Sequence, residues 1–233
     1  MKFPVIIAVR FGSTRLPGKC LLPFLDGSCM LDEIIKRVKS SNLVDLICIA
    51  TTMNVEDDAL EDYAIRNDLK CFRGSEKNVA DRVYQAAKSL NAEYFFEVLG
   101  DNPLIDPFFF QVLYEAYSTN CNLKYASFNT VEYNFNDKTV FPVGVRIQLV
   151  KTDEFIRILE TNNDYFYEHA TSFFYNKIDQ KDYVLIENFK NNDCEKFNLA
   201  VNTIDDFYLV ASVINESTNY RWENSVELYK LLK

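Results

Sequence analysis

A short apolar run near the start of the chain leads directly into a basic loop that contains glycine. Residues 3–9 read Phe-Pro-Val-Ile-Ile-Ala-Val, and residues 12–19 read Gly-Ser-Thr-Arg-Leu-Pro-Gly-Lys. The apolar run has the length and composition of a buried strand. Glycine lets backbone N–H groups approach a ligand closely, and Arg10, Arg15 and Lys19 supply positive charge. This order is typical of α/β proteins that hold phosphate groups at a strand end.

Two familiar phosphate-binding motifs do not fit this loop. A Walker A loop has four residues between its glycines, whereas five separate Gly12 from Gly18. It also has Ser or Thr after its lysine, where this chain has Cys20. The Gly-x-Gly-x-x-Gly fingerprint of dinucleotide-binding proteins is absent from the sequence. An ordinary solvated loop with basic residues is the alternative that stays open.

The charge of the chain is unevenly distributed. The formal net charge is −9, yet residues 1–40 carry seven Lys and Arg against three Asp and Glu. The overall acidity argues against nucleic acid as a partner. Positive charge is concentrated around the loop, where a triphosphate would need it. Within this segment we assign Lys36, Arg37 and Lys39 to a solvated helix face.

Length and composition favour one globular domain over residues 1–233, with a substantial apolar core. None of the six cysteines forms a Cys-x-x-Cys pair and there is one histidine, so we expect no zinc site. Several cysteines lie in apolar runs, as reduced thiols of cytoplasmic proteins do. No run approaches the roughly 20 apolar residues of a membrane span, and no signal peptide is evident. We therefore expect a cytoplasmic protein without a membrane partner.

Strand-like and helix-like patterns alternate along the first half of the chain. They predict strands at 3–9, 44–51 and 93–99 and helices at 30–38, 55–67 and 79–87. The second half is more mixed, with strands predicted at 139–150 and 183–189 and helices at 151–160 and 204–215. The fold class is therefore α/β, with a mostly parallel Rossmann-like sheet, helices on both faces and a mixed-strand C-terminal part.

A second motif follows the strand at 93–99. Residues 95–107 read Phe-Phe-Glu-Val-Leu-Gly-Asp-Asn-Pro-Leu-Ile-Asp-Pro. In a parallel sheet this strand end lies on the same edge as the basic loop, where ligands bind. A carboxylate there suits Mg²⁺, which takes hard oxygen donors. Asp101 is thus the best metal candidate, with a simple turn as the alternative. Asp106 fits a helix N-cap before Pro107.

Residues 10–19, Arg-x-Gly-Ser-Thr-Arg-Leu-Pro-Gly-Lys, resemble the signature of cytidylyltransferases that activate acidic sugars. This family includes the 3-deoxy-manno-octulosonate and acylneuraminate enzymes and the SpsF-like spore-coat polysaccharide proteins. The resemblance implies a nucleotide-diphospho-sugar transferase fold. It also implies transfer of CMP from CTP to an acidic sugar, with release of pyrophosphate, for surface polysaccharide synthesis. Members of the family are often homodimers and use Mg²⁺.

Carried over residue by residue, the resemblance implies the following roles. Arg15, Lys19 and Asp101 are the catalytic candidates. The triphosphate would be held by Arg10, Gly12, Ser13, Thr14, Arg15 and Lys19. Residues 72–83 resemble the segment that holds the base and ribose, which implies nucleotide-binding roles for Ser75, Asp81 and Arg82, and Thr51 ends a strand facing the same side. That segment also reads as a loop and a helix start, capped by Ser75 or Asn78.

A Glu-His pair, Glu168 and His169, resembles the pair near the sugar pocket of SpsF-like proteins. A structural or surface role for His169 stays open. Where those proteins tend to read Asp-Gly-Leu-Asp, residues 142–145 are Pro-Val-Gly-Val. If these positions face the sugar, its recognition differs here.

A third motif departs from the family pattern. Residues 199–207 read Leu-Ala-Val-Asn-Thr-Ile-Asp-Asp-Phe, whereas the family usually reads Val-Asp-Thr-Pro-Glu-Asp-Leu. The second metal-binding aspartate is therefore Asn202 here, and an amide oxygen attracts Mg²⁺ less than a carboxylate does. Asp205 is a possible substitute, or with Asp206 it favours a helix N-terminus.

Two alternative functions stay open from the sequence. One is a nucleotidyltransferase of the same fold that uses another nucleotide or a sugar phosphate. The other is a homologue that binds nucleotide or sugar without turning it over, as Asn202 and residues 142–145 suggest.

Overall fold

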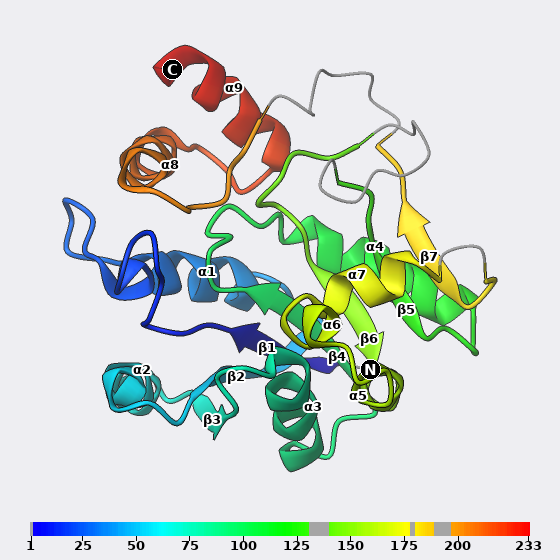
Figure 1. Cartoon of the computed structure of the whole chain (residues 1–233). Coiled ribbons are helices and arrows are strands. Elements are labelled where there is room, and N and C mark those ends of the chain that lie inside the picture. The colour runs from blue at the N-terminus through cyan, green and yellow to red at the C-terminus, as the bar shows by residue number, and fades with distance from the viewer. Residues whose placement is uncertain (1, 131–139, 178–179, 189–196) are drawn as a thin grey trace.

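The computed structural model describes residues 2–130, 140–177, 180–188 and 197–233 (Figure 1). Its centre is a seven-stranded sheet in the order β3-β2-β1-β4-β6-β5-β7. The strands are β1 (Phe3–Ala8), β2 (Val44–Thr52), β3 (Lys70–Gly74), β4 (Tyr94–Leu99), β5 (Tyr125–Phe128), β6 (Gln148–Lys151) and β7 (Tyr183–Ile186). Neighbouring strands are parallel, except that β6 runs antiparallel to β4 and β5. The predicted mostly parallel sheet with a mixed later part is confirmed.

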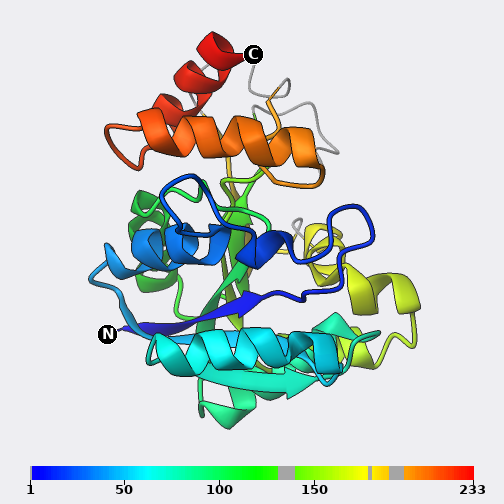
Figure 2. The same cartoon turned by 90° about the vertical axis from the view of Figure 1, so that its left-hand side faces the viewer.

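Helices cover both faces of the sheet. They are α1 (Met30–Lys39), α2 (Asp58–Arg66), α3 (Val79–Ser89), α4 (Phe108–Thr119), α5 (Glu154–Leu159), α6 (Asp164–Glu168), α7 (Ala170–Tyr175), α8 (Ile204–Glu216) and α9 (Trp222–Leu232), with short 3₁₀ turns η1 (Lys19–Leu21) and η2 (Val55–Asp57). Buried residues of α1, α2, α4, α8 and α9 share one apolar cluster, and those of α3, α5 and α7 form a second. Figure 2 shows α8, in orange, above the layer that contains α1.

The central strands supply side chains to both clusters in strict alternation. In β1, Val5 and Ile7 pack in the first cluster and Ile6 in the second. In β4, Phe96 belongs to the first and Phe95 to the second. Successive side chains of a strand point to opposite faces, so a strand buried on both sides must be apolar throughout. This is why the uninterrupted apolar runs of the sequence are central strands.

The predicted strand at 139–150 is wrong for most of the described part of that range. Only Gln148–Lys151 forms a strand, and residue 139 lies outside the described residues. Before it, Gly144 adopts φ +93°, a left-handed conformation that interrupts extended chain. Val143 instead pairs with the segment near residue 198, donating to the carbonyl of Phe197 at 3.2 Å. The apolar run in this segment therefore reflects burial of its side chains, not a continuous strand.

The assignment of Arg37 to a solvated helix face is also wrong. Its side chain is fully buried, while the two lysines predicted on the same face are exposed. The guanidinium donates to Glu33 at 2.7 Å and to the carbonyls of Ile105 at 3.0 Å and Tyr220 at 3.3 Å. A buried charge is tolerated when it is paired and hydrogen-bonded in this way.

Asp106 has the structural role that the sequence predicts. One carboxylate oxygen accepts the N–H of Phe108 at 2.9 Å, at the start of α4, and the other accepts that of Trp222 at 3.1 Å. Asp106 thus joins the starts of α4 and α9. None of the helices within the described ranges is long and apolar enough to cross a membrane.

Candidate active site

The loop after β1 and the end of β4 meet at the carboxyl edge of the sheet, as the topology predicts. There they border a pocket of about 360 Å³. Its wall includes Arg10, Ser13, Thr14, Arg15 and Lys19 from the loop, Gly100 and Asp101 from the end of β4, Arg82 from α3, Glu168 and His169 at the end of α6, and Asn202 before α8. Most of the predicted site residues are therefore gathered in one place from five parts of the chain.

Lys19 lies at the junction of three segments. Its ammonium donates to the carbonyl of Val201 at 2.6 Å and lies 3.4 Å from Oδ2 of Asp101. The N–H of Val201 donates in turn to the carbonyl of Asp101 at 2.9 Å. The chain before α8 is thereby held against the end of β4. These contacts give Lys19 a fixed orientation inside the pocket.

Arg15 and Asn202 meet on the same side. The guanidinium of Arg15 donates to Oδ1 of Asn202 at 2.7 Å. Asp206 accepts hydrogen bonds from the N–H groups of Asn202 and Thr203, at 3.0 and 2.8 Å, and so caps α8. Asp205 is exposed and does not line the pocket. The carboxylates that follow Asn202 therefore stabilise the helix start.

Four cationic side chains face this one pocket: Arg10, Arg15, Lys19 and Arg82. Arg82 is 2% exposed and donates to the carbonyl of Ser75 at 2.6 Å. Burial and the nearby charge of Arg10 lower the pKa of Arg82 to about 10, so its guanidinium stays charged at neutral pH. Glu168 lies 3.9 Å from Arg10, in a contact open to solvent. A polyanion in the pocket would relieve repulsion among these cations.

One oxygen in the pocket wall is suited to a hard cation. Oδ1 of Asp101 is buried and accepts no hydrogen bond within the described part of the chain. Asn202 lines the same pocket, and its amide oxygen, which accepts a hydrogen bond from Arg15, is the second candidate ligand. Among the residues that the structure describes, no three His, Cys, Asp or Glu side chains gather as a metal site. This donor set fits Mg²⁺, which commonly takes one or two protein oxygens and completes its shell with water and phosphate.

Four of the predicted nucleotide-binding residues lie outside the pocket wall. Thr51 is fully buried and donates its hydroxyl to Asp57 at 2.8 Å. Ser75 accepts the N–H of Asn78 at 3.0 Å, and Asp81 accepts the side chain of Gln85 at 3.1 Å. Gly12 belongs to the loop but does not border the cavity. The side chain of Asn78 caps α3, accepting the N–H of Asp81 at 2.8 Å.

The apolar segment 142–145 does not border this pocket either. Val145 is fully buried in the first apolar cluster. The departure from the family pattern at these positions therefore contributes to packing.

Sequence reasoning missed several contributors to the pocket and its surroundings, among them a backbone carbonyl and a thiol. The carbonyl of Val201 holds Lys19, but a backbone group leaves no signal in residue identity. Cys20 lines the wall and is buried, which raises the pKa of its thiol to about 11. Its position directly after Lys19 is the one sequence signal that indicated proximity to the site.

Known proteins resemble this chain in sequence over most of its length. Residues 4–221 match a family model described as Cytidylyltransferase. The spore coat polysaccharide biosynthesis protein SpsF of Bacillus subtilis (strain 168) is 28% identical over 233 residues, covering 97% of this chain and 92% of its own length. A 3-deoxy-manno-octulosonate cytidylyltransferase of Pelobacter propionicus is 32% identical over 114 residues, covering 46% of this chain and 41% of its own.

Solved structures share the whole fold. A cytidylyltransferase from Leptospira borgpetersenii serovar Hardjo-bovis (strain JB197) superposes with a TM-score of 0.86 at 25% identity, covering 99% of this chain and 94% of its own. A CMP:2-keto-3-deoxy-manno-octonic acid synthetase complexed with CTP gives a TM-score of 0.62 at 17% identity, covering 93% and 99%. The second likeness concerns the fold alone.

Proposed function

The chain belongs to the cytidylyltransferase family, and on that premise we propose that it transfers CMP from CTP to a hydroxyl of an acidic sugar, releasing pyrophosphate. The observation that carries this proposal is the convergence of Arg10, Arg15, Lys19 and Arg82 on one pocket at the carboxyl edge of the sheet. Four cations suit a triphosphate, whose charge must be neutralised before a hydroxyl can attack it. The relative from Bacillus subtilis supports a role in polysaccharide synthesis through its name.

The reaction forms a bond between the sugar oxygen and the α-phosphorus of CTP, while the O–H bond of the sugar hydroxyl breaks and its proton passes to solvent. The bond from that phosphorus to the oxygen bridging to the β-phosphate breaks, and pyrophosphate leaves with the electron pair. Catalysis of such a step consists mainly of positioning and neutralisation of charge. Lys19 and Arg15 would hold the leaving phosphates. A Mg²⁺ ion held by Asp101, with Asn202, would share phosphate oxygens and withdraw negative charge from them.

The sugar would occupy the neighbouring pocket, of about 400 Å³, which Arg10 and Glu168 share with the first. Its wall also contains Glu76, Lys77 and Asp164, and among these residues Lys77 and Arg10 are the candidate partners for a sugar carboxylate. Glu168 lines both pockets and His169 lines the first, so both are candidates to bind sugar hydroxyls. We assign no general base.

The proposal is tested first by binding and then by turnover. Thermal shift with each of the four nucleoside triphosphates and Mg²⁺ should give its largest stabilisation with CTP. Pyrophosphate release should then require both CTP and an acidic sugar. A larger thermal shift with another triphosphate would favour a nucleotidyltransferase of the same fold that uses that nucleotide. Pyrophosphate release with a sugar 1-phosphate in place of the acidic sugar would favour one that uses a sugar phosphate.

A second candidate is nucleotide binding without turnover. It is favoured by one observation, that the residue in the second metal position is a neutral amide already engaged by Arg15. Stabilisation by CTP without pyrophosphate release from any acidic sugar supplied would support it.

A further inference from the structure

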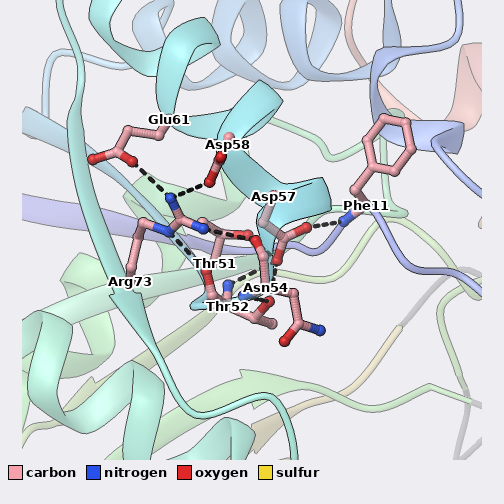
Figure 3. Close-up of polar contacts among 8 residues, drawn as sticks. All are labelled: Phe11, Thr51, Thr52, Asn54, Asp57, Asp58, Glu61 and Arg73. Atoms are coloured by element: carbon pink, nitrogen blue, oxygen red, sulfur yellow. Dashed lines mark hydrogen bonds and ion pairs between the residues drawn. The ribbon is translucent and has the colours of Figure 1, made fainter.

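Asp57 joins the end of β2 to the loop that forms the pocket (Figure 3). The residue is completely buried. Oδ1 of its carboxylate accepts the N–H of Phe11 at 2.6 Å. Oδ2 accepts the hydroxyl of Thr51 at 2.8 Å and both the N–H, at 2.9 Å, and the hydroxyl of Thr52. One side chain thus links three segments, and each of its oxygens faces donors.

Its environment keeps this carboxylate charged. Burial opposes ionisation, but the donors of Thr52, Phe11 and Thr51 outweigh it and hold the pKa of Asp57 below its usual range. A carboxylate accepting several N–H and O–H bonds is stabilised in its ionised form. The anion therefore binds Phe11 with a charge-assisted bond, which is stronger than a neutral one.

Phe11 is the point on which the basic loop closes. Its carbonyl accepts the N–H groups of Ser13 and Gly18, both at 2.8 Å. Gly18 has φ +71°, and a Cβ at that position would lie 2.8 Å from the ring of Phe11. Arg10 precedes Phe11 and Lys19 follows Gly18, so the two ends of this closed loop carry two of the pocket's cations.

Arg73 of β3 stabilises the turn that carries Asp57. Its guanidinium donates to the carbonyls of Thr52 at 2.9 Å and Asn54 at 2.7 Å. It also pairs with Asp58 at 2.5 Å and Glu61 at 2.8 Å on α2, as Figure 3 shows. Arg73 therefore attaches the turn between β2 and α2 to the neighbouring strand β3, and this holds the backbone of Asp57 in place.

We infer that Asp57 is a positioning residue for the triphosphate loop: by holding Phe11 it fixes Arg10 and Lys19 before nucleotide arrives. Preorganised groups bind more tightly because ordering them costs nothing at the moment of binding. The identity of the ligand rests on the proposed function, whereas the ordering of the loop does not. Asp57 itself does not line the pocket that holds these cations.

Asp57→Asn tests the inference with almost no change in size. An amide has one oxygen and one NH₂ group. In either orientation the NH₂ faces a backbone N–H, that of Phe11 or that of Thr52, and this N–H loses its acceptor. Leaving a buried donor without an acceptor is expected to weaken CTP binding roughly tenfold. Asp62→Asn is the matched control, since it removes the same charge from an exposed position of α2 and is not a partner of Arg73 or Asp57. Its dissociation constant for CTP should stay within about twofold of the original protein.

Three readouts separate positioning from a merely structural role. Dissociation constants come from calorimetry at a temperature where circular dichroism shows both variants folded. Hydrogen exchange of the Ser13 and Gly18 amides should become faster in Asp57→Asn. The rise in KM for CTP should exceed the fall in kcat. A lower melting temperature with unchanged CTP affinity and unchanged exchange would overturn the inference.

A second variant tests the inference if Asp57→Asn does not fold. Replacing Phe11 by its α-hydroxy acid turns the N–H into an ester oxygen and leaves every side chain in place. It should give the same loss, and CTP affinity within about twofold would again contradict the inference. If the unaltered protein binds no CTP, the proposed function fails, and loop exchange in the variants still decides the role of Asp57.

Discussion

Arg15 donates a 2.7 Å hydrogen bond to the amide oxygen of Asn202, although 187 positions separate the two residues in the chain. The partner is neutral, so the guanidinium keeps its full positive charge. A carboxylate at position 202 would neutralise part of that charge and would also attract a divalent cation. The identity of this one side chain therefore affects both anion binding and metal binding in the pocket.

Asn202→Asp is expected to lower the Mg²⁺ concentration needed for half-maximal activity by several-fold, because a carboxylate is the harder and charged ligand. Titration of activity, or of CTP binding, with Mg²⁺ measures the effect. Asn219→Asp adds the same charge at an exposed position and serves as the control. Equal Mg²⁺ dependence in both variants would show that residue 202 is not a ligand.

Lys19→Ala should weaken CTP binding by at least an order of magnitude, about 1.4 kcal/mol per tenfold. The substitution removes a side chain that is 13% exposed and whose ammonium is held by Val201 and Asp101 inside the pocket. Calorimetry with CTP measures it, and Lys39→Ala, at the exposed end of α1, is the control. Unchanged affinity would contradict the assignment of Lys19 to the triphosphate.

Asp101→Asn should abolish most Mg²⁺-dependent turnover, because it replaces a carboxylate by a neutral amide, which is a weaker ligand for Mg²⁺. The buried oxygen of that carboxylate has no hydrogen-bond partner among the described residues. Pyrophosphate release at limiting and saturating Mg²⁺ tests this expectation. Asp205→Asn, on the exposed start of α8, is the matched control. Normal turnover of Asp101→Asn at limiting Mg²⁺ would argue against a metal at this residue.

Glu97 should make the stability of the protein depend on pH. Its side chain is buried on β4, and burial raises its pKa from 4.5 to about 7, against the opposing effects of Arg146, Gln148 and Arg82. The folded protein then binds this proton more tightly than the unfolded chain. Stability therefore falls by roughly 3 kcal/mol as pH rises from about 4.5 to about 7, and is constant above that range.

Glu97→Gln should remove this fall in stability with rising pH. Chemical denaturation at several pH values between 4.5 and 8 would show it. The control is Glu93→Gln, whose side chain is 77% exposed in a surface pair with Lys151. Its stability should still fall as pH rises. The same pH dependence of stability in both variants would show that groups other than Glu97 cause it.

Gly144→Ala should destabilise the fold by more than about 3 kcal/mol. The backbone is at φ +93°, and an added Cβ would lie 2.3 Å from the backbone nitrogen of Ala200. Gly27 isolates the two effects, since it has φ +84° but nothing within 4 Å of an added Cβ. Gly27→Ala should cost only about 1 kcal/mol, the cost of a left-handed alanine. Equal losses in denaturant unfolding would mean that backbone strain alone explains both positions.

Much of the fold was predictable from local pattern. The strands at 3–9, 44–51 and 93–99 match β1, β2 and β4 closely, because a strand buried on both faces is continuously apolar. The edge strand β3 was missed, and of α4 only the start, at Asp106 and Pro107, was predicted. β3 is half-buried and short, and α4 opens with three consecutive phenylalanines that obscure helical periodicity.

By itself, the sequence determined the family, the layered α/β architecture and the basic loop, since these depend on residue order over short stretches. Only the tertiary structure decided what each charge contacts. In the folded protein Arg37 is buried, Thr51 donates a hydrogen bond to Asp57, and Arg15 donates one to Asn202. Such pairings join residues far apart in the chain, and they depend on packing geometry that residue identity does not encode locally.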